Sequence, residues 1–290
     1  HRALVPAITL VAPATAVLRI GATPIFADID PGNWLLTPAI AERALSEGRI
    51  DAVMPVSTFG CVQPVAAWDA FTSRHGVPVI VDAAGAFGNQ DVGRTTDVVF
   101  SFHATKSFGA EEGGAVLSGD SSRIAAIRRL SNFGIDTSIA MLTGIGTNGK
   151  MCEYQCAVGL ASFDMWEETK RRRTELHARY KEKIARIPGI GLQDKPDDGI
   201  YPLFPVLLPP GACAADAIET FREAGIETRS WYCPPLYQHP ALSGSSHMAD
   251  VRVAEDIGRR IIGLPFFLGM SEEDVDRVAD ALRSIVGAAA

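Results

Sequence analysis

The sequence predicts an α/β protein: a three-layer domain built on a largely parallel sheet, followed by a smaller α+β domain. Over the first 187 residues, short apolar runs alternate with helical patterns, which is typical of parallel strands covered by helices on both faces. The 290 residues, 47% of them hydrophobic, are enough for one large and one smaller core. Pro188-Gly189 and a polar cluster at 194–199 separate residues 1–187 from residues 188–290.

The first domain is expected to alternate strands and helices up to about residue 130. Ser121 is expected to cap the last helix of this series. Residues 132–150, rich in Gly, Thr, Ser and Asn, then predict a long functional loop. The expected strands are residues 3–10, 24–29, 52–57, 77–81, 98–102 and 114–118, and the expected helices are 38–46, 65–75 and 121–130.

One long interdomain helix is predicted over residues 151–187, with Trp166, Leu176 and Tyr180 on its apolar stripe. The smaller domain is then expected to mix strands and helices. Ser271 is expected to cap its closing helix. The expected strands are residues 202–208 and 227–230, and the expected helices are 214–224, 248–260 and 271–286.

Charge and hydropathy exclude some classes of protein. The chain has 27 basic and 34 acidic residues, a net charge of −7, and no basic block of the kind that binds nucleic acid. No apolar run reaches the roughly 18 residues that a membrane-spanning helix needs, and no signal peptide is visible. The chain begins at His1 rather than at a methionine, so we expect these residues to belong to a longer protein.

The five cysteines are scattered and include no CxxC pair. Cys152 and Cys156 stand at helical i,i+4 spacing but lack the nearby histidines that a zinc site needs. We therefore expect reduced thiols in a cytoplasmic protein, and no metal site.

Two stretches place chemical groups where predicted strands end. In VPVIVDAAGAFGN (77–89), Asp82 follows a buried strand, where a carboxylate can face the ligand crevice of an open α/β sheet. An aspartate at the end of a strand is equally often a helix N-cap or a turn residue. In VVFSFHATKSFGAEEGGAVL (98–117), Lys106 follows the next strand. A lysine at this place can be a nucleophile with a depressed pKa. Most single lysines, however, are simply surface residues.

Together these two stretches resemble the aspartate and lysine motifs of the DegT/StrS family of sugar aminotransferases, pyridoxal-phosphate enzymes of fold type I. The resemblance covers nearly the whole chain, and its motifs occur in the family's order, which makes chance agreement implausible. The other matching segments are residues 2–9, 21–30 (GATPIFADID), 144–160 (GIGTNGKMCEYQCAVGL), 227–237 (ETRSWYCPPLY) and 263–276 (GLPFFLGMSEEDVD).

The resemblance implies a cofactor, pyridoxal 5'-phosphate, and four residues that hold it. Lys106 would form a Schiff base with the cofactor and then act as general base and acid. Asp82 would pair with the pyridinium nitrogen. Ser101 would contact the phosphate, and Asn148 would reach the phosphate of a neighbouring subunit, so a homodimer with shared active sites is expected. His103 is interpreted as structural.

The sequence departs from the family pattern in four ways. Gly85 stands where the family usually has Gln or His beside the cofactor ring, and Leu10 where it usually has a stacking aromatic. Glu111 replaces the first glycine of the family's GEGG motif. The family's strand-turn-helix with a phosphate-binding Ser-Gly-Thr turn precedes the first matching strand, and this sequence begins after it.

The expected reaction is transfer of an amino group from glutamate or glutamine to a keto-sugar. The resemblance, rather than any residue here, implies that this sugar is linked to a nucleotide. Arg229, Tyr232 and His239 are substrate-facing candidates, or aromatics and charges that merely pack. One alternative is another pyridoxal-phosphate reaction on a sugar nucleotide; its dehydratase branch is expected to replace the lysine by histidine, which Lys106 argues against. Another is a non-catalytic or regulatory role. A dinucleotide-binding protein is disfavoured because no GxGxxG turn is present.

Overall fold

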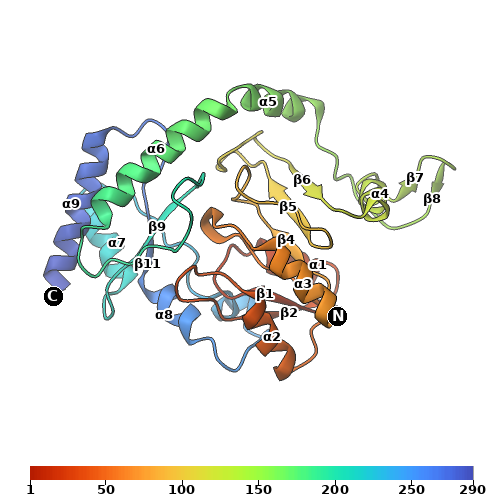
Figure 1. Cartoon of the computed structure of the whole chain (residues 1–290), viewed down its shortest axis with the longest axis horizontal. Helices are drawn as coiled ribbons and strands as arrows, with labels where there is room; N and C mark the ends of the chain where they lie inside the picture. Colours follow the sequence, from red (N-terminus) through yellow and green to blue (C-terminus); the bar gives the residue numbers. More distant parts are fainter. Residues whose placement is uncertain (290) are drawn as a thin grey trace.

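The computed structural model describes residues 1–289 and contains one extended, largely parallel sheet (Figure 1). One part of the sheet has the order β10-β2-β1-β3, all parallel: Ser246–His247, Thr23–Ala27, Arg2–Pro6 and Ala52–Val53. The other part consists of β4 (Ile80–Asp82), β5 (Asp97–Ser101) and β6 (Gly114–Leu117); β4 and β5 are parallel, and β6 is antiparallel. Two parallel bridges, Val53 to Val79 and Val56 to Asp82, join the two parts.

Helices cover both faces of this sheet, so the predicted three-layer α/β architecture is confirmed. Because side chains alternate along a strand, Leu4 of β1 packs under α2 and α3, whereas Val5 packs under α1 and α8. The covering helices are α1 (Ala12–Arg19), α2 (Pro38–Glu47), α3 (Val65–His75) and α8 (Arg252–Arg260), whereas α4 (Ser121–Leu130), which follows β6, buries none of its residues.

Several predicted boundaries in the first domain are wrong. The first strand ends at Pro6 rather than residue 10, and α1, which was not predicted, follows it with a proline in its first turn. The strand expected at 52–57 has only two residues in regular pairing. Asp120, not Ser121, caps α4: its carboxylate accepts hydrogen bonds from the backbone N–H groups of Ser122 (2.9 Å) and Arg123 (3.2 Å).

The predicted long helix is two helices, α5 (Glu153–Asp164) and α6 (Trp166–Ile184). They meet at Met165, whose backbone (φ −94°, ψ 2°) leaves the helical region. Directly after this break, the Trp166 ring packs among Phe108, Ile200 and Phe87. In Figure 1, α5 lies above β5 and β6, and α6 runs on toward the C-terminal half of the chain.

A second core forms around α6 and the C-terminal residues. β9 (Phe204–Leu207) pairs antiparallel with β11 (Ile261–Leu264), and Tyr180, Phe204, Phe221 and Leu282 pack together under α6, α7 (Ala214–Glu223) and α9 (Glu272–Ala289). The strand expected at 227–230 is wrong; only Arg229 bridges to Gly263 of β11, a strand that was not predicted. Ser271 caps α9 as predicted, accepting the Asp274 N–H at 3.1 Å.

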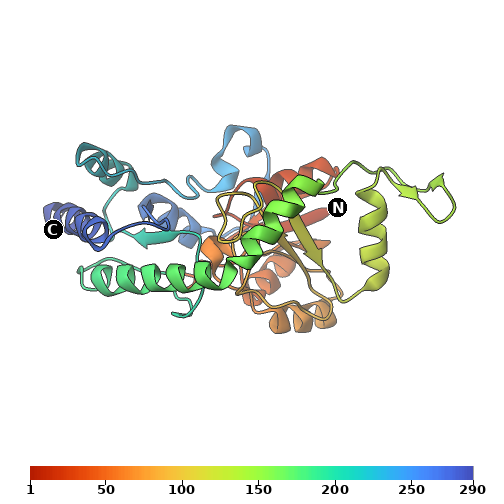
Figure 2. The same ribbon diagram turned by 90° about the horizontal axis from the view of Figure 1, so that it is seen from above.

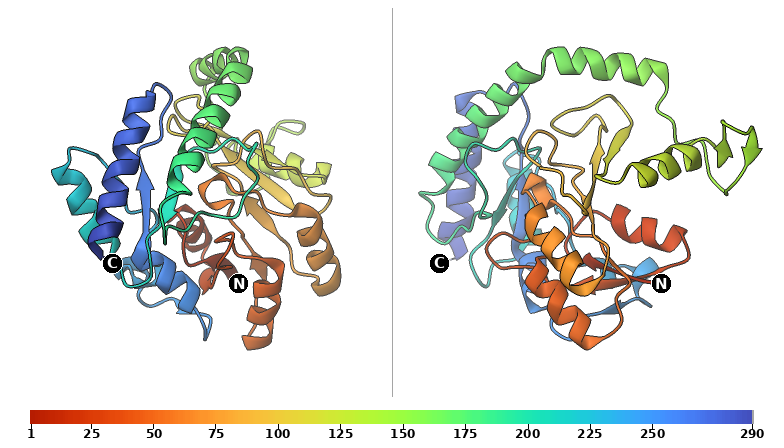
Figure 3. Two further views of the ribbon diagram at one scale, coloured as in Figure 1. Left: turned by 60° about the vertical axis from the view of Figure 1, so that its left-hand side comes forward. Right: turned by 45° about the vertical axis from the view of Figure 1, so that its right-hand side comes forward.

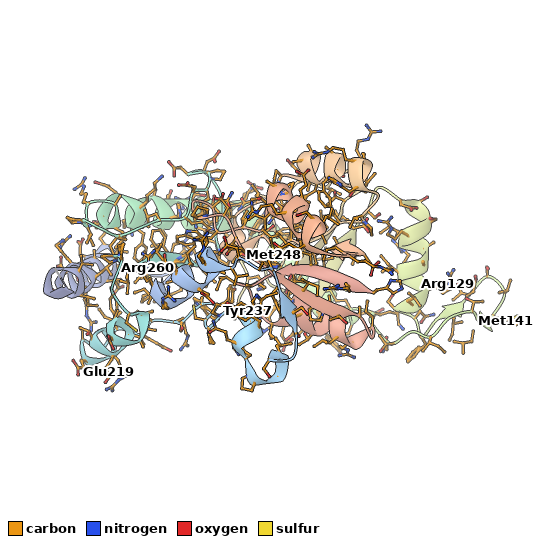
Figure 4. All side chains as sticks on the ribbon, turned by 90° about the horizontal axis from the view of Figure 1, so that it is seen from below. Arg129, Met141, Glu219, Tyr237, Met248 and Arg260 are labelled. Carbon is orange, nitrogen blue, oxygen red and sulfur yellow. The ribbon has the colours of Figure 1, made fainter. Side chains whose placement is uncertain are left out.

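Residues 132–150, predicted to be a long functional loop, form a projecting arm. The arm carries a short hairpin of β7 (Ile135–Asp136) and β8 (Met141–Leu142). Figures 2 and 3 show that α4 and this arm extend away from the sheet on the side opposite the C-terminus. In Figure 4, Arg129 at the base of the arm and Met141 in its hairpin lie far from Glu219 and Arg260. Within residues 1–289 no helix is both long and apolar enough to cross a membrane.

Asp69 of α3 fixes the turn that leads into β5. Its carboxylate accepts five hydrogen bonds, from the backbone N–H groups of Arg94, Thr95 and Thr96 and from both threonine hydroxyls, at 2.6–3.0 Å. Burial by itself would raise the pKa of Asp69, but these bonds outweigh it and hold the pKa well below its ordinary value. The ionised carboxylate is therefore a stabilising group of the native turn.

We expect Asp69→Asn to lower the free energy of unfolding at pH 7 by about 2 kcal/mol, because an amide replaces an anion that accepts five bonds. The folded pKa is depressed, so the stabilisation is complete above the unfolded pKa of about 4 and is lost as the pH falls through the folded value. Urea unfolding from pH 7 to pH 3 measures this. Asp91→Asn, on the exposed loop nearby, is the control. A difference from wild type that stayed constant down to pH 3 would contradict the argument.

Candidate active site

Asp82 lies at the carboxyl end of β4, held by its backbone on both sides. Its N–H donates to Pro55 O (2.9 Å), and its carbonyl accepts from Ser57 N–H (2.8 Å). Its carboxylate accepts the N–H of Ala84 at 2.9 Å. Burial raises the pKa of Asp82, opposed by the Ala84 bond and by the positive charge of Lys106.

Lys106 lies in the loop that follows β5, the strand next to β4. The loop is folded onto itself by backbone bonds: Lys106 N–H donates to His103 O (2.9 Å), Ala104 N–H to Glu111 O (2.8 Å) and Ala110 N–H to Phe102 O (2.7 Å). Burial lowers the pKa of the Lys106 amine, and the carboxylate of Asp82 opposes this effect. The structure therefore brings Asp82 and Lys106 within electrostatic reach of each other, each shifted toward its neutral form.

Ser101 is the last residue of β5, five residues before Lys106. Its oxygen accepts the His103 N–H at 3.3 Å, which leaves the hydroxyl hydrogen available to donate. The His103 ring is engaged locally, with Nδ1 2.9 Å from the Thr105 hydroxyl and Nε2 3.6 Å from Glu112. Ser107, next to Lys106, has a buried hydroxyl with no hydrogen-bond partner among the described residues.

Asn148 is exposed on the arm, where its backbone bridges to Asn132. Lys150 donates to the Asn132 side chain at 2.9 Å and lies 5.1 Å above the Phe133 ring. The arm that carries Asn148 extends away from the sheet (Figure 3).

Two departures from the family pattern have a structural explanation. A Cβ atom on Gly85 would lie 3.3 Å from Pro202 Cγ, so Pro202 fills the space in which a larger side chain would begin. Glu111 has φ +68°, the left-handed backbone that glycine adopts without strain. The family's glycine therefore suits the backbone at this position, and Glu111 keeps the same backbone in a less favourable conformation. Leu10 is 43% exposed between β1 and α1.

Of the three substrate-facing candidates, Tyr232 is the one that comes near Asp82. Its ring stacks on Phe59, with centroids 5.3 Å apart and planes 13° from parallel. Burial and the negative charge of Asp82 raise the pKa of the Tyr232 hydroxyl to about 12. Arg229 pairs with Glu227 at 2.6 Å, and the His239 ring lies 3.1 Å from Pro234 O.

The sequence did not predict a buried group of polar side chains next to Asp82, formed by one serine and two glutamines. The Gln90 Oε1 atom accepts from the Ser57 hydroxyl (2.9 Å) and from Gln63 N–H (2.7 Å). Gln90 Nε2 donates to Gln63 O (2.9 Å), and Gln63 Nε2 donates to Val56 O (2.8 Å). We call Ser57, Gln63 and Gln90 the amide clasp. The only sequence signal for this group is that its three polar residues lie between apolar runs. That signal is not specific, because most loops are polar.

The sheet, with an acid and an amine at the ends of adjacent strands, defines the class: a fold type I pyridoxal-phosphate enzyme, a fold shared by solved aminotransferase structures. The model of the DegT/DnrJ/EryC1/StrS aminotransferase family matches residues 2–283, and this chain belongs to that family. The resemblance predicted from the motifs is confirmed, and the protein is a pyridoxal-phosphate-dependent aminotransferase.

Two of the relatives have the names of sugar-nucleotide enzymes. The dTDP-3-amino-3,4,6-trideoxy-alpha-D-glucose transaminase of Streptomyces venezuelae is 32% identical over 97% of this chain and 75% of the relative. The GDP-perosamine synthase of Caulobacter vibrioides is 30% identical over 98% of this chain and 78% of the relative. The crystal structure of DesI in the presence of its TDP-sugar product superimposes with a TM-score of 0.88 at 32% identity, over 98% of this chain and 74% of DesI.

We expect the amide clasp to position Asp82. Gln90→Met keeps the side-chain length but removes the acceptor for Ser57 and Gln63, so it should destabilise the fold by about 2 kcal/mol and weaken pyridoxal-phosphate binding about 10-fold. A displaced Asp82 should also shift the pH titration of the bound cofactor's visible absorbance.

Gln238→Met, at an exposed glutamine, serves as the control. A Gln90→Met protein that is less stable, yet binds and titrates the cofactor like wild type, would show that the clasp supports the fold without positioning Asp82.

Proposed function

We propose that the protein transfers an amino group from glutamate or glutamine to a nucleotide-linked keto-sugar, with Lys106, Asp82, Ser101 and Asn148 as the cofactor-binding residues. The observation that most supports it is the opposed pKa shifts of Asp82 and Lys106 at neighbouring strand ends. The sugar-nucleotide relatives support the substrate class.

The donor set fits pyridoxal 5'-phosphate. Four polar groups lie around the ends of β4 and β5. They are the half-buried carboxylate of Asp82, the half-buried amine of Lys106, the Ser101 hydroxyl with its free hydrogen, and the Ser107 hydroxyl, which has no partner among the described residues. When bound, the cofactor supplies an electron-withdrawing ring that stabilises negative charge on the substrate carbon.

In this mechanism each residue has a separate task. Asp82 would pair with the ring nitrogen of the bound cofactor, and its burial would strengthen that interaction because little water competes. Burial lowers the pKa of Lys106, which favours the neutral amine, and this amine would hold the cofactor covalently and move a proton at the substrate carbon. Ser101 would donate to the phosphate.

We further propose a homodimer whose arm brings Asn148 to the partner's phosphate. Apolar side chains exposed on the arm and on α5 support this, because exposed apolar surface often marks a contact between proteins. Those more than half exposed are Phe133, Ile139, Met141, Leu142, Ile145, Tyr154, Leu160 and Phe163. We place the dimer in the cytoplasm, because the five cysteines are free within the described chain.

The first test is covalent attachment. We expect purified protein with added pyridoxal phosphate to show a visible band that borohydride traps on Lys106, as located by peptide mapping. Lys106→Ala should lose the trap and lower transamination at least about 10³-fold, because both the covalent linkage and the proton transfer are lost. Lys183→Ala, at a lysine of α6 that pairs with Asp276, is the control. A folded protein with no trapped lysine would support the non-catalytic alternative.

The second test concerns the shared site. Asn148→Ala should weaken cofactor binding about 10-fold without altering the fold, because one donor to a charged phosphate is lost. Mixing Lys106→Ala with Asn148→Ala protein should restore activity, since each mixed dimer contains one intact site. Ser138→Ala on the same arm is the control. Unchanged affinity, or no recovery in mixtures that exchange subunits, would refute a shared site.

A further inference from the structure

A small cavity lies away from the candidate active site, between α6 and the polar segment 192–197. Its volume is about 20 Å³, more than the roughly 10–15 Å³ that one water molecule requires. His177, Gln193 and Lys195 line it, together with Lys181 and Asp197, whose side chains form an ion pair and are exposed. Leu192, Phe204 and Pro205 complete the lining, so the cavity is small, mixes polar and apolar groups, and borders solvent through that pair.

Two buried polar atoms in this lining lack a hydrogen-bond partner in the described chain: His177 Nδ1 and Gln193 Oε1. His177 is 3% exposed and Gln193 6% exposed. The Gln193 amide orientation is fixed, because Nε2 donates to Asn33 O (2.7 Å) and Thr58 O (3.2 Å), which leaves Oε1 free to accept. Leaving such atoms unpaired costs about 1–3 kcal/mol each. A molecule bound in the cavity would give both atoms a hydrogen-bond partner.

Lys195 supplies a reactive group in the same lining. Its Nζ lies 3.8 Å above the centre of the Tyr201 ring, and the described chain gives it no carboxylate ion pair. Burial lowers the pKa of the Lys195 amine to about 7, with a smaller opposing effect of Cys61 and a further lowering by Lys181. Burial also lowers the pKa of His177 to about 3, so its ring is neutral. A substantial fraction of Lys195 is thus an unprotonated amine at neutral pH.

We propose that Lys195 is reversibly carboxylated by carbon dioxide. The Nζ lone pair attacks the carbon of CO₂ and forms a carbon–nitrogen bond. One carbon–oxygen π bond breaks, its electron pair moves onto that oxygen, which becomes the negatively charged carboxylate oxygen, and one Nζ proton leaves to solvent. The balance is amine plus CO₂ giving carbamate plus a proton, with no oxidation or reduction.

The carbamate matches the cavity in hydrogen-bonding character. It has one N–H, which suits the unpaired Gln193 Oε1, and carboxylate oxygens, which suit His177 with its hydrogen on Nδ1 and the ammonium of Lys181. A simple inorganic anion such as chloride would offer no donor to Gln193. A single water could satisfy Gln193 and His177, and water alone is therefore the competing occupant.

The test uses ¹³C-labelled bicarbonate and the full chain. We expect a protein-bound carbamate signal in the ¹³C NMR spectrum that is absent from Lys195→Arg. The signal should be present in Lys183→Arg, a control at a partly exposed lysine of α6 that pairs with Asp276 of α9. His177→Phe keeps an aromatic ring against Tyr201 and Phe204 but removes Nδ1, and should lower carbamate occupancy about 10-fold.

Alkylative trapping of the wild-type protein, followed by peptide mapping, should place the added carboxyl group on Lys195 without relying on any variant. A wild-type spectrum with no Lys195-dependent signal at millimolar CO₂ would overturn the proposal and leave water as the occupant. A signal that persists in folded Lys195→Arg protein would overturn it as well.

Discussion

The constraint on which the site depends is the pairing of Asp82 with the chain at 55–57. Regular pairing of β3 stops at Val53, yet the backbone of Asp82 bonds to Pro55 and Ser57, and Val56 bridges to it. The amide clasp keeps these residues in place after the ladder has ended, because all three of its side chains are buried and bonded. Buried amides that are fully satisfied specify one arrangement, since any other would leave a polar atom unpaired. One short loop thus joins the two parts of the sheet and fixes the acid.

The same loop meets the C-terminal half of the chain. Phe59, with φ +59°, stacks on Tyr232; Thr58 O accepts from Gln193; and Gly60, with φ +84°, lies against Pro202 and Gly85. A Cβ on Gly60 would approach Pro202 Cδ to 2.8 Å and Gly85 O to 2.9 Å, and a Cβ on Gly85 would lie 3.3 Å from Pro202 Cγ. A larger residue at either position would therefore crowd its neighbours. Gly85 therefore reflects close packing between the two halves as much as a missing cofactor ligand. The packing that removes a ring-facing side chain also brings Tyr232 toward Asp82.

The sequence was informative where physical patterns are local and failed where tertiary packing decides. Apolar runs located most strands of the parallel sheet, and Asp82 and Lys106 were identified because each follows such a run. The 8-residue helix α1 and the strand β11 escaped prediction because short apolar segments do not distinguish helix from strand. The break at Met165 escaped it because neither a proline nor a glycine marks the break in the sequence. The amide clasp joins residues 33 positions apart, and the cavity at Lys195 depends on α6 lying beside a loop; neither has a local signal.

Asp82 and Lys106 also place a constraint on the protein without its cofactor. Each is shifted toward its neutral form by burial, and each only partly offsets the other, which indicates that the site holds an acid and a base without an optimal ion pair. A ligand that carries a proton on a ring nitrogen and an electrophilic carbon gives both groups a partner at once. Binding of such a ligand would offset the cost of burying both groups, so its affinity would be linked to the stability of this part of the fold.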